Sequence, residues 1–148
     1  DPEACYKCHL EKKMEFSLQY HHPVPEGRIS CGDCHDPHKE EVRPWPAASL
    51  EKRNDLCFKC HADKRGPYVY PHEALDEGCT ICHNVHGSIN DKLLVMRDAT
   101  LCLQCHAQLD YPVVGRRAHG ANINQGTCFS GGCHTGVHGS NFDEHLRR

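Results

Sequence analysis

Large aliphatic side chains are scarce in this chain of 148 residues, and the sequence contains no long apolar run. Its mean hydropathy is −0.68. Chains with so few apolar residues bury a small core and are commonly stabilised by disulfides, metals or a bulky apolar cofactor. Because a transmembrane helix needs about 20 consecutive apolar residues, we expect no membrane span.

A surplus of positive charge is also lacking, since 17 Lys and Arg are outnumbered by 20 Asp and Glu and the formal net charge is −3. Nucleic acids are bound by clusters of basic side chains, so we expect no nucleic-acid partner. The chain begins at Asp1 and reaches Cys5 almost at once. We therefore expect an exported protein from which a signal peptide has been removed.

Cysteine and histidine, in contrast, are abundant, with 12 and 14 copies. The cysteines form six pairs along the chain, and a histidine directly follows the second cysteine of every pair. The six groups are Cys5, Cys8 and His9; Cys31, Cys34 and His35; Cys57, Cys60 and His61; Cys79, Cys82 and His83; Cys102, Cys105 and His106; and Cys128, Cys133 and His134. The sequence C-x-x-C-H is the attachment site of c-type haem.

The spacing of these groups has a geometric reason. On a helical turn, residues i, i+3 and i+4 share one face, so two sulfurs can reach the two vinyl groups of one porphyrin. The following histidine then becomes the proximal ligand of the iron. In the sixth group, Gly131 and Gly132 allow the two extra residues to loop out. The sequence therefore predicts six haem c groups.

Paired cysteines also occur in zinc sites and in disulfide frameworks. Twelve cysteines in C-x-x-C pairs are also compatible with three four-cysteine zinc sites, or with a disulfide framework. Neither alternative requires a histidine after the second cysteine of every pair. Haem attachment accounts for all six of these histidines and is the preferred interpretation.

The attachment groups recur in a fixed order that defines an internal repeat. Each repeat has a first group, a lone histidine, a second group and one more histidine shortly after it. We predict three tandem dihaem modules, at about residues 1–45, 46–95 and 96–148, within a single hexahaem domain. The expected fold is mostly irregular chain with short α-helices, little or no β-structure and a core of haem. Segments Leu50–Cys57 and Leu93–Cys102 are expected to contribute helices.

Eight histidines lie outside the attachment groups, enough to supply a second axial ligand to each of six irons. The histidine after the second group cannot reach the distal face of its own haem, so we assign it to the first haem of its module. The lone histidine is assigned to the haem that follows it. The predicted distal ligands, in haem order from the first to the sixth, are His38, His22, His86, His72, His138 and His119. His21 and His145 are spare and are expected to be solvated.

Several of these stretches resemble a known family. His22-Pro23-Val24, Cys31–His38 and Cys79–His86 with the following Gly87-Ser88 are similar to the doubled CXXCH motif of multihaem c-type cytochromes. This family includes the periplasmic decahaem cytochromes of outer-membrane electron conduits. It also includes extracellular cytochromes of metal-reducing bacteria, some of which form filaments. The resemblance implies electron transfer in the periplasm or outside the cell, with redox proteins or extracellular acceptors as partners.

Three functions are compatible with a chain that binds six haems. The first is an electron carrier or relay, favoured by the full supply of axial histidines. The second is a subunit of a cytochrome filament that associates head to tail, in which a spare histidine ligates a haem of the next subunit. The third is a reductase, which needs an iron with an open coordination position. Because the histidines suffice to close all six irons, we do not expect an enzyme.

Overall fold

The computed structural model of the chain describes residues 1–36, 50–97, 99–106, 113–114, 117–118, 128–129 and 132–147. The chain forms two compact units. Unit 1 contains Asp1–Lys59 and Gly78–Val95, and unit 2 contains Cys60–Glu77 and Met96–Arg148. None of the helices in the described ranges combines the length and the apolar character that a membrane crossing requires.

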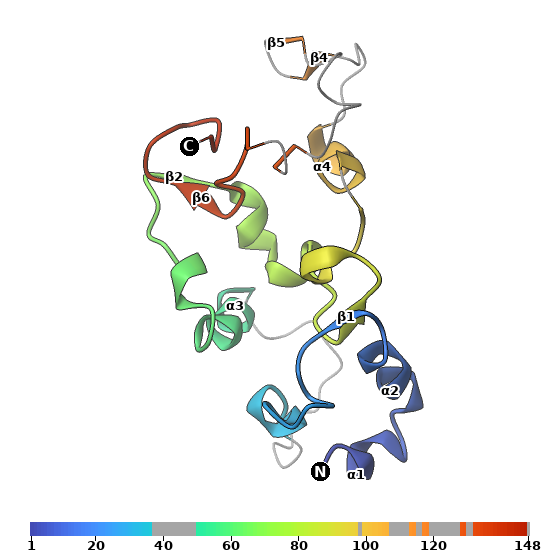
Figure 1. Cartoon of the computed structure of the whole chain (residues 1–148). Coiled ribbons are helices and arrows are strands. Elements are labelled where there is room, and N and C mark those ends of the chain that lie inside the picture. The colour runs from blue at the N-terminus through green and yellow to red at the C-terminus, as the bar shows by residue number, and fades with distance from the viewer. Residues whose placement is uncertain are drawn as a thin grey trace. The chain divides into compact units, whose positions relative to one another are not determined.

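Short elements joined by irregular chain make up both units, as the sequence predicted (Figure 1). The α-helices are α1 Glu3–Tyr6, α2 Leu10–Phe16, α3 Leu50–Phe58 and α4 Ala99–His106. The 3₁₀ turns are η1 Cys31–Asp33, η2 Ala62–Lys64, η3 Glu73–Glu77, η4 Cys79–Ile81 and η5 Asp91–Leu93. The strands have two residues each: β1 Tyr20–His21, β2 Tyr70–Pro71, β3 Gly87–Ser88, β4 Val113–Val114, β5 Arg117–Ala118 and β6 Gly139–Ser140.

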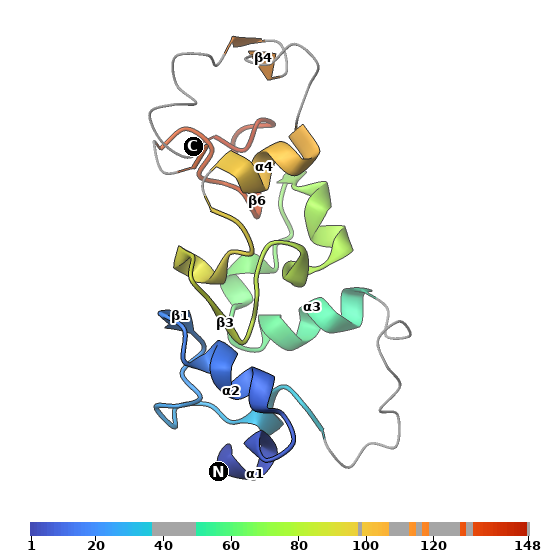
Figure 2. The same cartoon turned by 90° about the vertical axis from the view of Figure 1, so that its right-hand side faces the viewer.

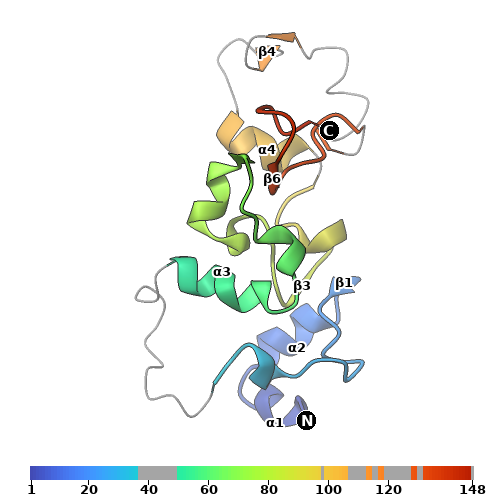
Figure 3. The same cartoon turned by 90° about the vertical axis from the view of Figure 1, so that its left-hand side faces the viewer.

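In unit 1, helix α2 contacts α1 and the antiparallel pair β1–β3 (Figures 2 and 3). Tyr6, Phe16 and Val24 form the buried cluster at this junction, with Ile29 and Cys31 packed against it. These three are the buried hydrophobic side chains among the described residues. Aliphatic side chains therefore contribute little core, which fits the expectation that haem supplies the apolar bulk.

In unit 2, the antiparallel pair β2–β6 repeats the arrangement of β1–β3. His21 pairs with Gly87 in one register, and Pro71 pairs with Gly139 in the other. The residue after each first strand is a lone histidine, His22 or His72. The repeat seen in the sequence is thus also a repeat of backbone pairing.

The two helix predictions had different outcomes. The helix expected over Leu50–Cys57 is confirmed as α3. The helix expected over Leu93–Cys102 begins only at Ala99. Lys92 and Leu93 have positive φ angles of 57° and 59°, and Leu94 is extended, because this stretch closes a loop around His83.

Candidate haem sites

The attachment groups adopt the helical turn that their spacing predicts. At the end of α1, the amides of Cys8 and His9 donate to the Cys5 carbonyl at 3.1 and 3.0 Å. The same two bonds close the turn from Cys31 to His35 and the turn from Cys79 to His83. Cys57 lies in α3, and Cys102 to His106 lie in α4. Both sulfurs and the histidine of each turn therefore share one face.

The sixth group keeps this closure despite its longer spacing. The His134 amide donates to the Cys128 carbonyl at 3.0 Å, as the histidine amides do in the turns that end at His9, His35 and His83. Gly132 has a φ of 76°, a conformation that glycine adopts without strain, and its amide donates to the Phe129 carbonyl at 3.1 Å. The extra residues are thus accommodated by a left-handed turn. Gly131 lies outside the described residues.

The two groups of a module meet at their first cysteines. Burial and the adjacent Cys5 thiol raise the pKa of Cys31. Burial and the adjacent Cys79 thiol raise the pKa of Cys57 to about 11. The first cysteines of the two attachment groups therefore lie side by side in the first two predicted modules.

Histidines from different modules face each other in two places. In unit 1, the rings of His35 and His86 are 6.1 Å apart between centroids, with planes 19° apart. In unit 2, the rings of His72 and His106 are 6.2 Å apart, also with planes 19° apart. Each pair combines the proximal histidine of one attachment group with a histidine outside the groups.

These distances fit two imidazoles on opposite sides of one iron. A metal–nitrogen bond of about 2 Å, plus roughly 1 Å from nitrogen to ring centre, places trans ring centres about 6 Å apart. The cysteines that precede His35 and His106 lie on the adjoining turns. The residues present therefore fit a haem c in both places.

The facing pairs differ from the sequence-based pairing. His86 was assigned to the Cys57/Cys60 haem and His72 to the Cys79/Cys82 haem, whereas they face His35 and His106. The predicted pairing takes each ligand from within one predicted module, but the strand pairs bring segments of neighbouring predicted modules together. His38 and His119 lie outside the described residues.

Backbone carbonyls orient four of the candidate ligands, His22, His72, His83 and His134. Where Nδ1 of an imidazole is held by a carbonyl, Nε2 is the nitrogen that can reach a metal. Nδ1 of His22 donates to the Val85 carbonyl, and Nδ1 of His72 donates to the Val137 carbonyl at 2.7 Å. Val85 and Val137 precede His86 and His138. The carbonyl that holds each lone histidine therefore belongs to the residue directly before the histidine that follows the second group.

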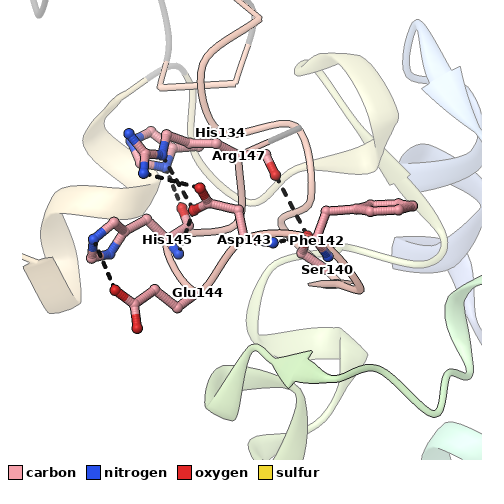
Figure 4. Close-up of polar contacts among 7 residues, drawn as sticks. All are labelled: His134, Ser140, Phe142, Asp143, Glu144, His145 and Arg147. Carbon is pink, nitrogen blue, oxygen red and sulfur yellow. Dashed lines mark hydrogen bonds and ion pairs between the residues drawn. The ribbon is translucent and has the colours of Figure 1, made fainter.

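A loop after the second attachment group holds the proximal histidine in modules two and three. Nδ1 of His83 donates to the Lys92 carbonyl at 2.8 Å. Nδ1 of His134 donates to the His145 carbonyl at 2.7 Å (Figure 4). Buried serines close the loops, since Ser88 Oγ donates to the Leu94 carbonyl at 2.7 Å and Ser140 Oγ to that of Arg147.

These carbonyl and serine contacts were not predicted from the sequence. Their signal is the tetrapeptide Val-His-Gly-Ser, which occurs at residues 85–88 and again at 137–140. The glycine is needed because the backbone passes close to a neighbour. A Cβ on Gly87 would lie 1.9 Å from the Glu15 carbonyl oxygen, and one on Gly139 would lie 2.3 Å from the Tyr68 ring.

The two spare histidines are engaged in other contacts. Nδ1 of His21 contacts the Leu18 carbonyl at 2.6 Å, and Nε2 contacts Glu26 at 3.0 Å, which raises the pKa of His21. The His145 imidazole is 61% exposed, and Nε2 lies 3.5 Å from Glu144. His145 contributes to the site through its backbone carbonyl (Figure 4).

Comparison with known proteins agrees with this geometry. The family model of the doubled CXXCH motif matches residues 21–66 and 72–111. The chain therefore belongs to the multihaem c-type cytochromes with doubled CXXCH motifs. It is 38% identical over 149 aligned positions to multiheme cytochrome MtrA of Shewanella baltica (strain OS185). The alignment covers 94% of this chain and 43% of that relative, so the chain spans less than half of the relative's length.

Proposed function

We propose that the chain transfers electrons along a row of six covalently attached haem c groups, each with two axial histidines. The facing pairs His35–His86 and His72–His106 carry this proposal, because their spacing suits an iron closed on both sides. Haem iron supplies reversible one-electron chemistry when it is bound. The chain fixes the irons and closes their coordination, so we expect electron transfer without catalytic turnover.

The axial ligands are proposed to connect neighbouring modules. His86 of the second module serves the haem of Cys31 and Cys34 in the first. His72 of the second module serves the haem of Cys102 and Cys105 in the third. His22 and His138, which the sequence analysis placed on these two haems, then serve other irons. Ligands exchanged in this way hold successive haems close together, which favours rapid electron exchange between them.

The proposed setting is respiration outside the cytoplasmic membrane, in the periplasm or outside the cell. The relative named above is a multiheme cytochrome, and covalent haem attachment suits an exported protein. Partners are proposed to be redox proteins or extracellular electron acceptors. Because haem propionates add negative charge to a chain whose formal net charge is already −3, partner surfaces are expected to be basic around their own redox centre.

Haem content and spin state test the proposed function. Purified holoprotein should show six haems per chain by pyridine haemochrome assay and intact mass. Its ferric electron paramagnetic resonance spectrum should be entirely low-spin, because two imidazoles give a strong ligand field. Fewer than six haems, or a high-spin signal from a native haem, would contradict the proposal.

A filament of stacked chains is a second proposal, favoured by the exposed imidazole of His145. That side chain is available to a haem of another copy, whereas both ring nitrogens of His21 contact Leu18 and Glu26. Negative-stain electron microscopy of the native protein should then show fibres that His145→Ala disperses. Discrete particles at every protein concentration and ionic strength would rule the filament out.

A further inference from the structure

One candidate ligand lies beside a carboxylate instead of a backbone carbonyl. Nδ1 of His86 lies 3.0 Å from the carboxylate oxygen Oε2 of Glu15. Four other site histidines direct Nδ1 to a backbone carbonyl, and these are His22, His72, His83 and His134. A carboxylate carries a full negative charge, so it acts on a ligated imidazole more strongly than a carbonyl dipole does.

The packing around Glu15 fixes its position beside His86. The side chains of Glu15 and His86 are 27% and 24% exposed. Phe16 packs its ring against that of His86 at 5.4 Å in an edge-on orientation. Gly87 passes against the Glu15 carbonyl with no room for a side chain. Helix α2 and strand β3 therefore bring the two groups together at a partly desolvated junction, where charge acts strongly.

We propose that Glu15 lowers the reduction potential of the haem attached at Cys31 and Cys34, which is the haem that His86 ligates in the proposed function above. Ferric iron carries one more positive charge than ferrous iron, so a nearby carboxylate stabilises the oxidised state. The negative charge beside the imidazole also makes it a stronger electron donor, which acts in the same direction. Glu15 is a positioning and tuning residue that acts on the iron through His86.

Lys12 opposes Glu15 at the same junction. Its Nζ donates to Glu15 Oε1 at 2.8 Å, and the two side chains are 37% and 27% exposed. The ammonium group reduces the negative charge that His86 experiences. Loss of Glu15 is expected to raise the reduction potential of the haem attached at Cys31 and Cys34. Loss of Lys12 is therefore expected to lower the potential of the same haem.

Helix α2 also offers a matched control. Glu11 lies 3.6 Å from Nδ1 of His9, but these side chains are 56% and 66% exposed. The chemical groups are the same, while water screens them. Glu11→Gln should therefore shift haem potentials much less than Glu15→Gln.

The test is a spectropotentiometric titration of full-length holoprotein for wild type, Glu15→Gln, Lys12→Gln and Glu11→Gln. Glu15→Gln should move one of the six redox steps to higher potential, and Lys12→Gln should move the same step lower. A Cys31→Ala/Cys34→Ala background, which lacks the affected haem, should abolish both shifts. Haem count and low-spin spectra of each variant confirm that ligation is retained.

The outcomes separate this proposal from the proposed function. Six low-spin haems with unchanged potentials in Glu15→Gln would overturn the role of Glu15 and leave the haem assignment intact. A potential shift in Glu15→Gln that persists in the Cys31→Ala/Cys34→Ala background would also overturn the role of Glu15. A wild-type protein lacking a low-spin haem at this attachment site would overturn both. If Glu15→Gln does not fold, Lys12→Gln still decides, since an unchanged or raised potential contradicts the proposal.

Discussion

Replacing His86 by alanine should convert one of the six haems from low-spin to high-spin and raise its reduction potential. Alanine supplies no ligand, so the iron loses the imidazole that faces His35 at 6.1 Å. One bis-histidine haem in six should therefore disappear from the ferric electron paramagnetic resonance spectrum, and a high-spin signal should replace it. His21→Ala is the control, because His21 also lies outside the attachment groups, but its ring nitrogens contact Leu18 and Glu26 and it ligates no iron in the proposed function.

The same substitution decides between the two pairings when it is combined with loss of a haem. In a Cys31→Ala/Cys34→Ala background, His86→Ala should produce no new high-spin haem, because the iron it serves is already absent. In a Cys57→Ala/Cys60→Ala background, the high-spin signal should still appear. The reverse pattern would support the assignment of His86 to the Cys57/Cys60 haem and refute the facing pair.

Gly87→Ala should destabilise the protein and disturb the haem that His86 is proposed to ligate. The added Cβ would lie 1.9 Å from the Glu15 carbonyl oxygen and 2.7 Å from its carbonyl carbon. Backbone cannot move aside as a flexible side chain can, so we expect a loss of about 2 kcal/mol or more. Strand β3 carries Gly87 directly after His86, and its displacement should also reduce the low-spin fraction.

Thermal unfolding of the ferric holoprotein, followed by the Soret band, measures this loss. Gly32→Ala is the matched control, because the nearest atom to its added Cβ is Ser30 Oγ at an ordinary 3.7 Å. Gly32 also lies between the cysteines of the affected haem, so the control tests whether any glycine change near that site is harmful. Equal melting temperatures for Gly87→Ala and wild type would show that α2 and β3 are not packed as described.

The attachment groups were predictable from the sequence because their geometry is local. A turn that joins Cys5, Cys8 and His9 is closed by bonds between residues three and four apart, so the spacing alone specifies the shared face. The left-handed turn at Gly132 followed from glycine's freedom at positive φ. The scarcity of aliphatic residues anticipated a small side-chain core, and Tyr6, Phe16 and Val24 bear this out among the described residues.

The histidine rings that face each other were decided by the tertiary structure. His35 and His86, like His72 and His106, are far apart in the chain, and they meet because two-residue strands pair across module boundaries. Sequence spacing favoured ligands within one module, since it weighs the length of the intervening chain and contains no information about strand pairing.

The contacts that orient the imidazoles likewise could not be predicted from the sequence. Their acceptors are mostly backbone carbonyls, such as those of Val85 and Lys92, which every residue type possesses. The contact between Glu15 and His86 joins a helix to a strand that comes much later in the chain. The sequence by itself determined the turns that bring two cysteines and a histidine to one face, because these turns depend on local spacing. Only the folded chain decided which histidine faces His35 and His106 and which charge lies beside it, because these depend on packing between distant segments.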